Sequence, residues 1–211
     1  MIKFAWEALA PGRYRVQIQT PAVREGTLHR LTAAIFVSGL DIESGEILTV
    51  QEDGELYSAD EFILRYDGPV DEAAAVIARD LGLLMETLLD PSADVAAIFK
   101  DRGVTPPDAF KYFNVPPEVL FEDGPNETRF YFEAENHTGL LYNLTALLVQ
   151  SDVNIVSGSI KTHETGRAED NLYLQYNDGP LTSVQSQNIA ETIFQLPGDR
   201  TAIERTSLES T

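Results

Sequence analysis

Short apolar stretches alternate with longer helical patterns along the chain, and this order predicts a mixed α+β fold. The stretches Tyr14–Thr20 and Arg129–Glu135 are apolar enough for strands, and each runs into a loop that contains glycine. A helical pattern follows each loop. In the second half its apolar residues recur at intervals of three and four, which places them on one face of a helix. These residues are Leu141, Leu144, Leu147 and Leu148.

The second half of the chain repeats the first. Gly26–Ile47 aligns without a gap onto Gly139–Ile160, a shift of 113 residues, and ten of the 22 aligned pairs are identical. This is more than two amphipathic segments would share by chance. The likeness resumes between Ser58–Pro69 and Arg167–Pro180. Internal repetition of this kind predicts two structural units of one type.

Each copy is predicted to contain a strand, a helix, two strands, a second helix and a closing strand. Glycine-containing turns at Glu52–Glu55 and His163–Arg167 join the middle strands as hairpins. The β-α-β-β-α-β order is that of a ferredoxin-like unit, an antiparallel sheet with both helices on one face. The other predicted elements are strands Asp41–Val50, Val153–His163, Glu61–Tyr66 and Asn171–Tyr176, helices Val70–Leu89 and Thr182–Phe194, and closing strands Val119–Asp123 and Thr201–Thr206.

The repeat divides the chain into two domains and a linker. Residues 1–90 form the first unit and residues 128–211 the second, with residues 118–123 as a candidate for the final strand of the first. Residues 91–127 contain one short helical pattern and two Pro-Pro pairs, which favours a packed linker. The sheet face away from the helices is expected to be apolar, and a second copy is expected to cover it or to pair at its edge.

The charge and the composition exclude several classes of partner. Lys and Arg total 15 against 34 Asp and Glu, a formal charge of −19 that disfavours nucleic acid and anionic membrane surfaces. The absence of cysteine excludes disulfides, thiolate catalysis and zinc–sulfur sites. Since the N-terminus lacks a signal-peptide pattern and no apolar run reaches the ~20 residues that span a bilayer, we expect a cytoplasmic protein.

The segment Glu135–Tyr176 resembles an ACT domain, a small regulatory module that binds amino acids and controls metabolic enzymes. It has the family's strand, Asn-bearing loop, X-Gly, Leu-Leu helix, Asn-Ile strand and hairpin, with Thr138 where the family often has proline. Its ending and the stretch Pro116–Pro125 look most like the tandem ACT region of bacterial uridylyltransferases of nitrogen signalling. The resemblance covers residues 128–194 well and 14–89 more weakly.

The resemblance implies a ligand site in the second copy. In ACT domains similar to this one, an Asn of the loop and an Asn of the next strand both contact the ligand, and Asn136 and Asn154 match them. An amide can accept from an ammonium and donate to a carboxylate, so two Asn residues suit a zwitterion. The implied ligand residues are Asn136, His137, Thr138, Gly139, Leu140, Asn154 and Ile155.

A structural interpretation of the same residues is also open. Asn136 and Thr138 could cap the following helix, and Gly139 could simply turn the corner. Ala134 stands where a histidine used in serine recognition is often found. The first copy has Val23 and Asp41 in place of the two Asn residues, so we expect it to be the weaker site or only a scaffold.

Catalysis is not predicted. The three histidines, His29, His137 and His163, show no metal-binding spacing, and the sequence has no P-loop, GxGxxG motif or nucleophile elbow. No nucleotidyltransferase signature accompanies the ACT resemblance. We therefore expect no enzyme activity, no cofactor and no metal.

Two functions remain open from the sequence. The first is a free-standing amino-acid sensor with its ligand at an ACT–ACT interface, for which nitrogen signalling suggests glutamine. It would act on a partner enzyme or signalling protein and could form a homodimer through the ACT sheets. The alternative is an interaction or structural module of the same fold without a small ligand. An enzyme on this fold is a third reading, against which the missing acid–base groups count.

Overall fold

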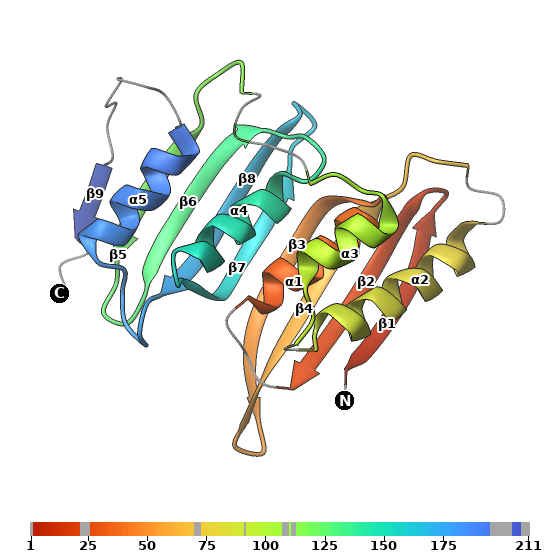
Figure 1. Ribbon diagram of the computed structural model, residues 1–211. Helices are drawn as coiled ribbons and strands as arrows, with labels where there is room; N and C mark the ends of the chain where they lie inside the picture. Colours follow the sequence, from red (N-terminus) through yellow and green to blue (C-terminus); the bar gives the residue numbers. More distant parts are fainter. Residues whose placement is uncertain are drawn as a thin grey trace.

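The computed structural model describes residues 2–21, 26–69, 73–90, 92–106, 110, 113–194 and 204–207. Within these ranges nine strands form one sheet in the order β1-β2-β4-β3-β7-β8-β6-β5-β9, and five helices lie on one face of it (Figure 1). None of the described helices is long and apolar enough to cross a membrane. The strands are β1 (Lys3–Ala10), β2 (Arg13–Pro21), β3 (Asp41–Glu52), β4 (Glu55–Arg65), β5 (Glu118–Asp123), β6 (Thr128–Glu135), β7 (Asn154–Thr162), β8 (Arg167–Gln175) and β9 (Glu204–Ser207). The helices are α1 (Thr27–Val37), α2 (Ala73–Leu88), α3 (Val95–Arg102), α4 (Leu140–Gln150) and α5 (Ser183–Phe194).

The predicted repeat is confirmed in the order of the elements. The first half contains β2-α1-β3-β4-α2 and the second contains β6-α4-β7-β8-α5. In each half the strands alternate buried residues, which face the helices, with more exposed ones, as in β6 with its buried Thr128, Phe130, Phe132 and Ala134. The α+β class, with helices on one face of a mainly antiparallel sheet, is thereby confirmed.

The predicted closing strands are wrong, because the fourth strand of each half precedes the repeat. β1 pairs antiparallel with β2, and β5 pairs antiparallel with β6. Each half therefore reads β-β-α-β-β-α, and residues 118–123 belong to the second half of the sheet. A tight turn at Gly12, whose φ is 72°, joins β1 to β2. A hairpin between neighbours in the chain needs no long crossover, which is why it can fill the position expected for the last strand.

The regions around the repeats are partly as predicted. The helical pattern in the linker is α3, whose cap Asp94 accepts hydrogen bonds from the backbone N–H groups of Ala96 and Ala97. The strand predicted at residues 201–206 overlaps β9, which pairs in parallel with β5 at the edge of the sheet and so does not close the second unit. Residues 70–72 and 201–203 of the predicted elements lie outside the described residues.

The two halves are joined side by side at a seam between β3 and β7, and an approximate two-fold axis relates them. Glu46 pairs with Ser159, its own equivalent in the repeat, at the centre of the antiparallel β3–β7 ladder. On the helix side the hydroxyls of the equivalent residues Thr32 and Thr145 lie 3.0 Å apart and are buried. Equivalent residues can meet in this way only near a two-fold axis, so the two halves of the repeat pair within one chain.

The sheet face opposite the helices is mostly polar, although Leu48 and Tyr173 are exposed on it, and the predicted apolar face is not observed. Its strands carry charged residues at the positions that alternate with the core, and many are paired across neighbouring strands. A face of this kind has little apolar surface to bury and does not require a covering partner. The ion pairs include Arg15–Glu7, Arg129–Glu122 and Arg167–Glu133.

Candidate functional site

The seam ends in two equivalent corners, each formed by the start of a helix from one half and a strand from the other. The α1 corner consists of Gly26–His29, Ser58, Asp60 and Asn154–Val156. The α4 corner consists of the equivalent residues Gly139–Tyr142, Ala168, Asp170 and Asp41–Glu43. Helices α1 and α4 run antiparallel, since a side chain at Gly26 would lie 3.6 Å from Val149 in the last turn of α4.

Glycine precedes both helices for a conformational reason. Gly26 and Gly139 have φ values of 80° and 84°, a left-handed conformation that other residues rarely adopt. No side chain among the described residues caps either helix start, so the capping by Asn136 or Thr138 that the sequence allows is not observed. Backbone N–H groups at such a helix start carry partial positive charge and suit an anionic group.

The seven predicted ligand residues are not brought together. Asn154 lies beside Gln175 at one end of the second half, next to the start of β6, while Asn136 follows the other end of β6. The eight residues of β6 separate the two ends by roughly 25 Å. Asn136 to Leu140 lead into and begin α4, at the α4 corner, whereas Asn154 and Ile155 line the α1 corner.

The loop Asn136–Leu140 has structural contacts of its own. The backbone N–H of Asn136 donates to the carbonyl of Gly166 at 2.8 Å, and the carbonyl of His137 accepts from the N–H of Leu140 at 3.0 Å. The His137 ring lies 5.7 Å from the ring of Phe113. Thr138 is exposed and Leu140 is buried. These contacts account for the turn from strand to helix that the sequence places here.

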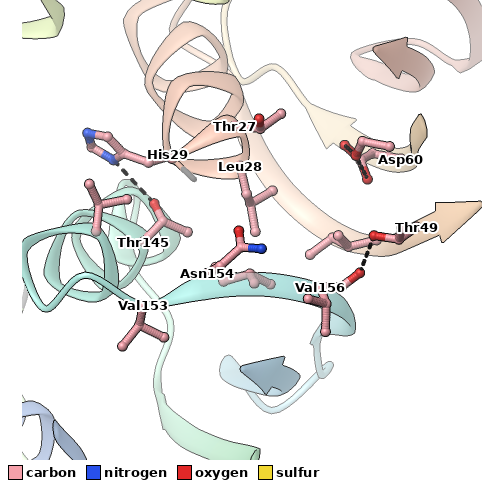
Figure 2. A pocket seen from close by; sticks show the side chains of 14 residues that line it. Thr27, Leu28, His29, Thr49, Asp60, Thr145, Val153, Asn154 and Val156 are labelled. Atoms are coloured by element: carbon pink, nitrogen blue, oxygen red, sulfur yellow. Dashed lines mark hydrogen bonds between the residues drawn. The ribbon is translucent and has the colours of Figure 1, made fainter. Parts of the chain in front are cut away.

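The α1 corner encloses a small pocket (Figure 2). Its walls combine the start of α1, Asn154–Val156 of β7 and the polar side chains Ser58 and Asp60 of β4, with aliphatic groups such as Val149 and Val153 between them. At its rim the Thr49 hydroxyl donates to the Val156 carbonyl at 2.7 Å, which ties β3 to β7 beyond their ladder. The space of about 20 Å³ holds about one water molecule.

Asp60 is the most unusual group in this pocket. It is only 3% exposed, and the Ser58 hydroxyl donates to both of its carboxylate oxygens, at 2.9 and 2.8 Å. Burial raises the pKa of Asp60 to about 6, opposed by the hydrogen bonds from Ser58 and the Leu48 backbone. The sequence patterns did not single out this residue, although a charged residue two positions before the inward-facing Phe62 was a usable signal.

His29 faces the other half of the protein rather than Asp60. Its Nδ1 lies 3.4 Å from the Thr145 hydroxyl (Figure 2). Its ring stacks on that of Tyr142, its own repeat equivalent, with the ring centroids 5.1 Å apart. Burial lowers the pKa of His29, so the imidazole is neutral near pH 7. The residue therefore helps to join α1 to α4. Among the described residues, no group of three or more His, Asp and Glu side chains could hold a metal ion.

Comparison with known proteins adds little to this geometry. No protein-family model and no curated protein matches the sequence. A solved structure titled as the crystal structure of an aspartate kinase from Synechocystis aligns with 87% of this chain, at a TM-score of 0.44 and 13% sequence identity. The alignment covers 27% of that protein's chain, so this chain spans about a quarter of its length. A likeness this distant carries no argument about function.

Proposed function

We propose that the protein is a regulatory module that binds a small amino acid in the α1 corner, between its two halves. The observation that carries this proposal is the pocket in which a buried carboxyl group, Asp60, lies with the start of α1 and Asn154. The helix start suits a carboxylate, Asp60 suits an ammonium, and the Asn154 amide can bond to either. The aliphatic walls suit a small apolar side chain.

The same geometry supports a regulatory role. The pocket holds about one water, so an amino acid can enter only if the α1 start and β7 move apart. These elements belong to different halves, and a ligand that contacts both favours one relative position of the halves over the other. Such a change is what a partner enzyme or signalling protein could detect. Glutamine, which the uridylyltransferase resemblance suggests, has a longer side chain than a small apolar amino acid and would require α1 and β7 to move further apart.

Thermal unfolding with each of the twenty amino acids at millimolar concentration tests this proposal. A ligand at a hundredfold excess over its Kd stabilises the folded state by ~2.7 kcal/mol. For a chain of this size each kcal/mol raises Tm by roughly 2–4 °C, so a shift of roughly 5–10 °C is expected for the preferred amino acid.

A matched pair of variants locates the effect. Asn154→Ala is expected to abolish the shift, whereas Asn136→Ala, which removes the other predicted ligand amide at the far end of the second half, is expected to keep it. Equal loss in both variants would contradict a site in the α1 corner. A wild-type protein whose Tm responds to none of the amino acids would instead favour an interaction module without a small ligand.

A further inference from the structure

The approximate two-fold axis allows the two corners to be compared position by position. Strand pairing makes Thr20 and Ser58 neighbours in the first half and Ala134 and Ala168 neighbours in the second, at equivalent positions. Both corners retain a buried aspartate, Asp60 or Asp170, opposite the equivalent residues Ile47 and Ile160. The α1 corner therefore has two hydroxyls beside its aspartate where the α4 corner has two methyl groups.

These hydroxyls change what the aspartate can do. Asp60 accepts one bifurcated hydrogen bond from the Ser58 hydroxyl, shared between its two carboxylate oxygens, and this bond favours its charged form. The carboxyl of Asp170 is only 1% exposed, and its Oδ1 has no hydrogen-bond partner among the described residues. A buried carboxyl without donors is held in its neutral form, so only the α1 corner offers a carboxylate supported as an anion.

Thr20, which neighbours Ser58 but is not part of the pocket wall, provides a second observation beside the α1 corner. Its side chain is 5% exposed, and its hydroxyl has no hydrogen-bond partner within the part of the chain that the structure describes. It lies directly opposite Ser58 in the β2–β4 register. Buried polar groups are nearly always paired, so an unpaired hydroxyl beside Ser58 and Asp60 indicates a missing partner at this place.

The two corners also differ in the residue that the strand from the other half contributes. Asn154 of the α1 corner is replaced in the α4 corner by Asp41, whose Oδ2 lies 3.3 Å from Arg65. A carboxylate at this position repels the carboxylate of an amino acid, while a neutral amide does not. Both differences favour the α1 corner for a zwitterion, although the sequence resemblance implied the loop of the second copy.

We propose that Asp60, supported by Ser58, binds the ammonium group of the ligand, and that the protein holds one ligand per chain, in the α1 corner only. This inference rests on the proposed function and narrows its ligand class to amino acids with a free α-ammonium group. An ammonium has three N–H donors, and Asp60, Ser58 and the Asn154 amide oxygen supply acceptors from two strands. The α4 corner has the same backbone arrangement but lacks an aspartate that is hydrogen-bonded in its charged form.

The test uses the full chain at pH 8, where Asp60 is ionised, with free amino acids and their N-acetyl derivatives as probes. N-acetylation keeps the carboxylate and the side chain but removes the ammonium. Titration calorimetry with the amino acid that stabilises the wild-type protein is expected to give one site per chain. The N-acetyl derivative is expected to give no binding.

Asp60→Asn and Asp170→Asn form a matched pair of buried, equivalent and nearly isosteric substitutions. Asp60→Asn is expected to weaken binding roughly 10- to 100-fold, because a charge-assisted contact is lost, while Asp170→Asn leaves the Kd unchanged. Ser58→Ala copies the α4 corner and is expected to weaken binding several-fold. Circular dichroism shows whether each variant folds. If Asp60→Asn does not fold, Ser58→Ala still tests the role of Asp60.

Three results would overturn the inference while leaving an amino-acid sensor in place. They are wild-type affinity in both Asp60→Asn and Ser58→Ala, equal binding of the N-acetyl derivative, and two sites per chain. A flat response of both the wild-type protein and Asp170→Asn to every free amino acid would be a different failure. It would overturn the proposed function, and this inference with it.

Discussion

Raising the pH from about 4 to about 8 is expected to cost the folded protein several kcal/mol of stability, and Asp170 is expected to carry most of the loss. Burial, reinforced by the neighbouring charge of Glu169, raises the pKa of Asp170 from 3.8 to about 7. Unfolding exposes the carboxyl and returns its pKa to the ordinary value. A shift of this size corresponds to about 4 kcal/mol.

The direction of this pH dependence follows from the number of protons that the folded and unfolded states bind. Between about pH 4 and pH 7 the folded state holds a proton on Asp170 that the unfolded state has released, so stability is complete below this window and is lost through it. Asp60, with a pKa raised to about 6, acts in the same direction. Glu133 acts in the opposite direction, because hydrogen bonds from Tyr131 and Arg167 lower its pKa.

Urea unfolding of the wild-type protein and Asp170→Asn across this pH range isolates the effect, since the other titrating groups cancel in the difference. The free energy of unfolding of the variant is expected to rise relative to wild type by about 4 kcal/mol between pH 4 and pH 8. A constant difference between the two proteins at every pH would show that Asp170 does not titrate in this way.

Gly158→Ala is expected to destabilise the protein by about 2–3 kcal/mol through overpacking at the seam. An added Cβ would lie 2.6 Å from the carbonyl oxygen of Asn171 and 3.1 Å from the Cα of Leu172, closer than backbone atoms allow. Neither contact can be relieved by rotating a side chain. Because Gly158 pairs with Ile47 across the seam, the strain is expected to reach the pocket wall as well.

Gly82→Ala is the matched control. Gly82 lies in the interior of α2, where an added Cβ would meet the Phe4 ring at an ordinary 3.7 Å. Removing a flexible glycine from a helix is expected to stabilise the protein by about 0.5–1 kcal/mol. Equilibrium unfolding in urea measures both variants. Equal effects of the two substitutions would contradict the close approach of β8 to Gly158.

The internal repeat in the sequence predicts more of this fold than the pattern of any single helix or strand does. Thr32 and Thr145 stand out there as an identical pair 113 residues apart, and their hydroxyls meet on the axis between the halves. The elements of each repeat follow from apolar patterns and glycine turns. The strand at Lys3–Ala10 was missed because this hairpin partner lies outside the repeated pattern, whereas the strand predicted at Val119–Asp123 is present as β5 but pairs with β6 of the second half.

The site could not be placed from the sequence, because it depends on how the halves pair. Asn136 and Asn154 are 18 residues apart in the chain, but Asn154 lines a pocket with the start of α1 from the other half, whereas the backbone of Asn136 bonds to Gly166 in its own half. The helix start that faces Asn154 is therefore that of α1. Asp60 was missed for a related reason: a lone acidic residue in a strand gains meaning only when its burial and its Ser58 contact are known.

Amide hydrogen exchange of the wild-type protein, with and without a millimolar mixture of the twenty amino acids, tests the proposed site most directly, because the readout does not depend on which amino acid binds. The expected result is slower exchange at Leu28 and His29 and at Asn154–Val156, with no change at the equivalent amides of Leu141, Tyr142 and Ile42. Unchanged exchange in both corners, or protection confined to the α4 corner, would contradict an amino-acid site in the α1 corner.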